Sequence, residues 1–190
     1  MNKYHIINNL PFGFDFSNRN RKKLREYSEW FFQNKRIRIA ELCSAVDSFI
    51  GKTWNNDFSV RSFDELNYFL LSNIESKPLS EEELIVKRNN IPSYIDIETW
   101  DLTIKSRSLL IDIGIYWGEV IIKNHSQLHL EQYFPRNKKS IDYGHMVIIL
   151  GNNPPINPVW LMYIQGLKVI GGESSQDLLN RLYSIWTCSI

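Results

Sequence analysis

The sequence predicts an α+β fold, in which one mainly α-helical domain spans residues 1–190 and carries a small antiparallel β-sheet of two to three strands near residues 127–150. Three observations lead to this fold class. Apolar residues recur with a helical period along most of the chain, this period gives way to a weak alternation after residue 126, and no repeat or linker divides the chain. With 43% apolar and 13% aromatic residues, the chain can bury one sizeable core.

The dense apolar run at residues 99–124 is the expected core element. A helix is favoured because the helical period persists over residues 102–121, whereas strands usually have about 4 to 8 residues. A strand from about Leu109 is the alternative, since Gly114 and Gly118 each cost a helix about 1 kcal/mol relative to alanine. In a helix, the four-residue spacing of these glycines offers one smooth face on which another element can approach closely.

The other elements follow from caps, chain breakers and apolar spacing. Pro11 interrupts residues 1–17, which are expected to form an irregular arm. Ser62 with Glu65, and Ser80 with Glu83, have the spacing of capping boxes. The segment GNNPPINP is expected to be a loop that ends in an asparagine cap and a proline at the first helical position. Helices are therefore expected at residues 18–34, 35–50, 63–74, 80–88, 99–124, 158–170 and 176–186, and strands at residues 127–134 and 146–150, with a third at residues 109–117 if that run is a strand.

Charge is segregated along the chain although the net charge is only +1. Residues 19–38 hold eight basic side chains against two acidic ones, and residues 57–101 hold ten acidic against four basic. A partner-binding role is considered for Arg21, Lys22, Arg25 and Arg36, and an ordinary solvated face is the simpler interpretation. The small net charge gives no global field for nucleic acid or a membrane, so neither is an expected partner.

The central helix would place its polar side chains on one narrow stripe, Lys105, Ser108, Asp112, Tyr116, Glu119 and Lys123. Asp112 and Glu119 would then lie roughly 10 Å apart along the helix axis, a range at which two carboxylates can share acid and base roles. Asp112, Tyr116 and Glu119 are accordingly the candidate ligand site. The favoured interpretation is structural, because Lys123 follows Glu119 at the spacing of a helical ion pair.

Common catalytic and cofactor motifs are missing from the sequence. It has no HExxH pattern, no phosphate-binding glycine loop and no GxSxG elbow, so no catalytic residue, cofactor or metal is assigned. The N-terminus lacks the pattern of a signal peptide, and charges interrupt the longest apolar run. Cys43 and Cys188 form no paired motif, which is typical of a protein of the reducing cytoplasm.

One short motif supports a resemblance. An aromatic-rich helical region, the segment WNNDFSVRSFDEL, a long apolar element ending in GIYWGEV, a short strand unit and a proline-capped helix resemble uncharacterised small bacterial protein families. In those families a G-Y-x-G-E-V-type motif closes a central helix before a small sheet, and some of them are similar to immunity proteins. The resemblance implies an α+β cytoplasmic domain that acts by binding a protein, and it transfers no catalytic residues.

The leading hypothesis is therefore a non-enzymatic, cytoplasmic protein-binding module, with an immunity or antitoxin protein that occludes a cognate bacterial toxin as its specific form. The alternative is an enzyme or small-ligand-binding protein that uses Asp112, Tyr116 and Glu119. These hypotheses differ in a structural feature, because only the alternative requires the three side chains to converge on an open cleft.

Overall fold

The computed structural model of the chain describes residues 4–13, 16, 19–151 and 153–188. Within them the secondary structure is mainly helical with two small antiparallel sheets, which confirms the predicted α+β class. Along the chain the elements are α1 (Arg21–Ile50), the 3-10 turn η1 (Val60–Ser62), α2 (Phe63–Asn73), β1 (Ser76–Pro78), α3 (Glu81–Asn89), β2 (Trp100–Leu102), α4 (Ile104–Asn124), β3 (His129–Gln132), β4 (Met146–Leu150), β5 (Asn153–Ile156), α5 (Pro158–Ile170) and α6 (Leu178–Thr187).

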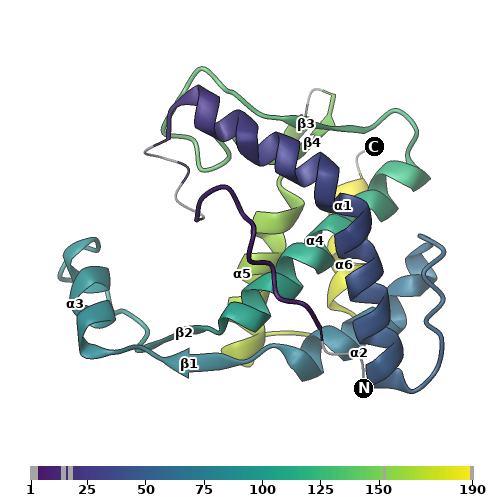
Figure 1. Cartoon of the computed structure of the whole chain (residues 1–190), viewed down its shortest axis with the longest axis horizontal. Coiled ribbons are helices and arrows are strands. Elements are labelled where there is room, and N and C mark those ends of the chain that lie inside the picture. Colours follow the sequence, from purple (N-terminus) through teal and green to yellow (C-terminus); the bar gives the residue numbers. More distant parts are fainter. Residues whose placement is uncertain (1–3, 14–15, 17–18, 152, 189–190) are drawn as a thin grey trace.

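Helix α4 lies at the centre of the fold, with α1, α5 and α6 packed against it (Figure 1). From Ser108 to Ile121 every residue of α4 is buried except Glu119. Such a helix must be apolar on nearly all faces, which explains why its sequence satisfies both a helical and a strand pattern. The prediction of a central helix is confirmed, and the strand alternative for residues 109–117 is wrong.

The two glycines of α4 lie where α5 approaches most closely. A Cβ atom on Gly114 would stand 2.8 Å from the carbonyl oxygen of Pro158 and 2.9 Å from the Cα atom of Val159. A Cβ atom on Gly118 would meet side chains alone, the Pro158 ring at 3.2 Å and Cδ1 of Ile148 at 3.6 Å. The predicted smooth face is therefore confirmed, and the start of α5 occupies it.

The larger sheet is three-stranded and antiparallel, in the order β3, β4, β5. The predicted pairing of its first two strands is confirmed, with His129 opposite Ile149 and Gln132 opposite Met146. The third strand is β5, which forms within the segment that was expected to be a loop. Its two prolines are tolerated because β5 is an edge strand that pairs on one side only.

Three predicted boundaries are wrong. Residues 18–50 were expected to form two helices, but α1 runs unbroken because no glycine or proline interrupts it and Lys35 and Arg38 pair with acids on α4. The central helix begins after its cap Thr103 rather than at Thr99, because Trp100–Leu102 pairs with β1 as a strand. The last helix begins at Leu178, after Asp177, rather than at residue 176.

One predicted capping box is confirmed and the other is wrong. Ser80 accepts a hydrogen bond from the backbone N–H of Glu83, whose side chain accepts one from the backbone of Ser80. Ser62 makes no capping bond because its hydroxyl donates to the carbonyl oxygen of Ser59 and accepts from Tyr116.

The N-terminal arm has no regular secondary structure over residues 4–13, and residues 1–3, 14, 15 and 17 of the expected arm lie outside the described residues. It packs along α1 and α4. The backbone N–H of Ile7 donates to Ser108 at 2.9 Å, and the indole N–H of Trp30 donates to Asn9 at 2.9 Å. The N-terminal arm therefore covers the part of the polar stripe at Ser108 and Asp112.

Candidate functional site

Asp112 lies in a closed polar network at the junction of the N-terminal arm, α1 and α4. Arg38 donates two hydrogen bonds to its carboxylate, from Nε at 2.9 Å and from Nη2 at 2.6 Å, and Tyr4 donates a third at 2.5 Å. Asp112 is fully buried, and burial raises its pKa to about 6 although the bonds from Arg38 act in the opposite direction. This network joins three segments of the chain, and its buried carboxylate is not available to a ligand.

Tyr116 and Glu119 have partners of their own. The hydroxyl of Tyr116 donates to Ser62 at 2.8 Å, and burial raises its pKa to about 12. Glu119 pairs with Lys35 of α1 at 2.8 Å. Its predicted pairing with Lys123 is wrong, because the ammonium of Lys123 lies over the ring of Phe58, 3.1 Å from its centre.

The structure therefore does not bring the three candidate ligand-site residues together. Asp112 faces the N-terminal arm and α1, Tyr116 faces η1, and Glu119 faces α1. Each of the three polar groups has a hydrogen-bond or ion-pair partner within the protein. The stripe on α4 is a packing surface for neighbouring segments.

The predicted basic surface is smaller than the sequence suggested. Arg38 is buried against Asp112, and the guanidinium of Arg21 lies over the ring of Phe134 at 4.5 Å. Arg21, Lys22, Arg25 and Arg36 are exposed, and their role in binding a partner stays a prediction. Their positions on α1 do not form one unbroken basic stripe, because the exposed acid Glu29 lies on the same face between Arg25 and Arg36.

The most unusual surface is a projecting arm, defined here as residues 75–101. It runs through β1, α3 and β2, and Figure 1 shows α3 at its far end, away from the other helices. No residue between Ile74 and Leu102 is buried. The arm is instead held by bonds within itself: Lys87 donates to the carbonyl oxygen of Glu98 at 2.9 Å, and Arg88 to that of Ile95 at 2.8 Å.

The projecting arm combines exposed apolar side chains with negative charge. Ile85, Val86, Tyr94 and Ile95 are 60%, 62%, 85% and 44% exposed. The arm has seven acidic side chains against three basic ones, a net charge of −4. The sequence analysis missed this surface, although one signal was available: Leu84, Ile85 and Val86 are consecutive, so they cannot all lie on the buried face of one helix.

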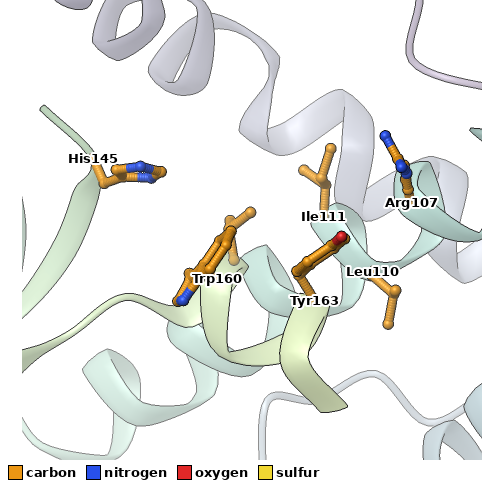
Figure 2. A pocket seen from close by; sticks show the side chains of 7 residues that line it. Arg107, Leu110, Ile111, His145, Trp160 and Tyr163 are labelled. Atoms are coloured by element: carbon orange, nitrogen blue, oxygen red, sulfur yellow. The ribbon is translucent and has the colours of Figure 1, made fainter. Parts of the chain in front are cut away.

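A pocket of about 110 Å³ opens between the first half of α4, the start of α5 and the residue that precedes β4. Figure 2 shows His145 on one side and Arg107 on the other, with Ile111, Trp160 and Tyr163 between them. Burial lowers the pKa of His145 to about 4, so its imidazole is neutral at pH 7. The sequence analysis did not identify this pocket, because its residues come from three segments with no shared motif.

Within the described parts of the chain, no group of three or more His, Cys, Asp or Glu side chains is arranged to hold a metal ion. No helix among those residues is both long and apolar enough to cross a membrane. Comparisons of the chain with protein-family models, with curated proteins and with solved structures gave no match.

Proposed function

We propose that this protein is a non-enzymatic binding protein whose projecting arm docks on a partner protein with a basic surface. The observation that carries the proposal is the exposure of four large apolar side chains on a segment in which no residue is buried. These four side chains lie within eleven residues of one segment, and exposed apolar side chains that gather on one surface mark an interaction site. A partner that covers these side chains would supply the apolar contacts that the body of the protein does not make.

Burial of the exposed apolar side chains would favour binding of the projecting arm to a partner protein. Covering one exposed aliphatic or aromatic side chain stabilises a complex by roughly 1.5–3 kcal/mol before the costs of association. The arm also needs support, since a two-stranded hairpin with no buried face is marginally stable in water. Binding would therefore order the arm and bury its apolar side chains in one step.

The charge of the arm specifies the chemistry of the partner. Lys77 is paired with Glu83, and the side chains of Lys87 and Arg88 bond to carbonyl oxygens of the arm itself. Glu81 and Glu82 remain exposed on the first turn of α3. A basic surface would complement these carboxylates and would raise the association rate by electrostatic steering.

An immunity or antitoxin protein is the specific form of this function that we propose. Proteins that act on nucleic acids carry basic surfaces at their active sites, because they must contact phosphates. An acidic arm that reaches away from the body can cover such a site. The resemblance of the GIYWGEV segment to immunity-like bacterial families supports the same proposal, together with a cytoplasmic location and a toxin as partner.

Site-specific photo-cross-linking in the producing cells tests the proposal. Ile85 is replaced by the photoreactive amino acid p-benzoylphenylalanine, and in a matched variant the same replacement is made at Phe32, which is 51% exposed on α1. We expect one basic protein to be cross-linked from position 85 and not from position 32. The Glu81→Lys/Glu82→Lys variant should lose this product, because its charge would repel a basic surface.

The purified partner then tests the immunity function. We expect it to form a stoichiometric complex with the intact chain and to lose its own activity in that complex. Cross-linking of the same proteins from both positions would contradict docking by the arm. A product that contains a second copy of this chain would instead assign the arm to self-association.

A further inference from the structure

The pocket between α4 and α5 has the size and walls of a site for one small ring. Its volume of about 110 Å³ is comparable to that of engineered apolar cavities, about 150 Å³, that bind benzene. Leu110, Ile111 and Val159 are buried and form apolar walls. Trp160 and Tyr163 stack on each other at 5.2 Å, and both are half-buried at the surface.

Two polar atoms at this pocket lack hydrogen-bond partners. Among the described residues, three buried side-chain nitrogen or oxygen atoms are unpartnered: Ser59 Oγ, Arg107 Nε and His145 Nδ1. The last two belong to residues that line the pocket. Both atoms are closed off from solvent, so a ligand oxygen meets either one only after a rotation of its side chain. Because a buried unpaired polar group is costly and uncommon in native proteins, such a contact would be favourable.

The polar side chain of His145 is enclosed by apolar and aromatic residues. Its side chain is 5% exposed, and its ring stacks on Phe16 with a separation of 3.6 Å between centres. A neutral imidazole has one donor and one acceptor nitrogen, and Nδ1 makes no hydrogen bond among the described residues. A polar substituent of a ligand can therefore be recognised at this side of the pocket as well.

The charges on the Arg107 side of the pocket favour a neutral ligand. The guanidinium of Arg107 forms an ion pair with Asp101 of β2, so its positive charge is already balanced. Its unpaired Nε–H can only donate, and it therefore selects an oxygen acceptor. An anionic ligand would also meet the carboxylate of Asp101.

We infer that this pocket binds a neutral monocyclic aromatic molecule with an accepting oxygen, such as an aromatic carboxamide, with the ring between Ile111, Trp160 and Tyr163 and the oxygen at Arg107. This site is separate from the proposed docking of the projecting arm. Its ligand is a small molecule rather than a protein, and it can be tested on the purified chain alone.

The test is the binding of benzamide to the intact protein, measured by saturation-transfer NMR and by isothermal titration. We expect binding of one benzamide with a Kd of about 1 mM or tighter, as is usual for so small a ligand. Toluene, which has the ring without the oxygen, should bind at least tenfold more weakly, and so should benzoate, because of its charge.

Matched variants in the first turns of α4 locate the bound oxygen. Arg107→Met should weaken benzamide binding about tenfold or more, since the donor is charged and the site is partly buried. Lys105→Met, on the same helix but outside the pocket, should leave binding unchanged. Circular dichroism and the unfolding midpoint confirm that both variants are folded.

Three results would overturn the inference: no binding of benzamide at millimolar concentration, equal binding of toluene and benzamide, or an unchanged Kd in folded Arg107→Met. The first would remove the ring site. The second and third would remove the recognition of the oxygen. None of them would affect the proposed docking of the arm.

Discussion

Arg38 and Asp112 form the most deeply buried ion pair among the described residues, with side-chain exposures of 8% and 0%. Removing one partner leaves an uncompensated charge. We expect Arg38→Met to lower the free energy of unfolding by about 3–5 kcal/mol at pH 8, where Asp112 is ionised. The Arg38→Met/Asp112→Leu double variant should recover part of this loss, because it buries no charge. Urea unfolding measures both effects.

The ion pair of Lys35 and Glu119 also joins α1 and α4, and it is the control for the buried pair. Their side chains are 24% and 16% exposed, so solvent screens the pair more. Lys35→Met should cost no more than about 1 kcal/mol. Equal losses in Lys35→Met and Arg38→Met would show that the network around Asp112 has no special structural role.

His145 should make stability depend on pH. Burial lowers the pKa of its imidazole from 6.5 to about 4, so between these values the unfolded state binds a proton that the folded state does not. Stability is therefore fully present above pH 6.5 and falls as the pH drops toward 4, by about 3 kcal/mol in total. The raised pKa of Asp112 acts with the opposite sign in the same range, because the folded carboxyl binds a proton below about pH 6.

The effect of His145 is isolated by comparison with His145→Phe, which keeps a ring against Phe16 and still contains Asp112. We expect the wild type to lose stability relative to this variant as the pH is lowered from 7 to 4. Unfolding midpoints measured at several pH values give the difference. Parallel curves for the two proteins would show that His145 is not buried in its neutral form.

For individual residues, the sequence could identify the polar side chains of the central helix but not their bonding partners. Helical spacing placed Lys123 beside Glu119, whereas the actual partner, Lys35, is 84 positions away. Arg38 and Tyr4 are 74 and 108 positions from Asp112. Local spacing contains no information on such contacts, which depend on how the helices pack.

Helices α4 and α5 meet at Gly114, where an added methyl group has no space. We expect Gly114→Ala to destabilise the fold by about 1–3 kcal/mol, because its Cβ atom would collide with backbone atoms of Pro158 and Val159. The gain in helix propensity, about 1 kcal/mol, is too small to reverse this loss. The shift in the urea midpoint measures it.

Gly118→Ala is the matched control, since it brings the same gain in propensity and meets side-chain atoms alone, the ring of Pro158 at 3.2 Å and Cδ1 of Ile148 at 3.6 Å. It should be less destabilising than Gly114→Ala, or neutral. The reverse order of the two variants would show that α5 does not approach α4 closest at Gly114.

For the elements, the sequence predicted most helices and the pairing of β3 with β4, because these depend on periodicity and local caps. It did not predict the pairing of β1 with β2. Each of these strands has three residues and makes a pattern too short to recognise. The start of α4 was placed too early for the same reason. The three residues Trp100–Leu102 pair with β1 as a strand, and this strand is too short to recognise in the sequence.

For the molecule as a whole, the sequence predicted the fold class and the separation of charge but not the projecting arm. Glu81–Asn89 has a regular capping box and apolar residues, which are typical of any helix that packs on a core. Only the tertiary structure shows that α3 has no core to pack on. The segregated acidic charge is explained in part, because seven of the acidic residues lie on the arm.

The arm should be dispensable for folding. None of its residues is buried, and Ser76 and Leu102 lie opposite each other in the β1–β2 pair, so a short Gly-Asn-Gly link can replace residues 77–101. We expect this arm-less chain to fold with nearly the wild-type unfolding temperature, because the cores around α4 are retained. Thermal unfolding followed by circular dichroism measures this.

Titration of the cross-linked partner with the arm-less chain tests the proposed docking most directly. Isothermal titration calorimetry is performed with the intact chain and the folded arm-less chain under identical conditions. We expect the intact chain to bind stoichiometrically and the arm-less chain to give no binding heat. Binding of the arm-less chain with the affinity of the intact chain would contradict the docking role of the projecting arm.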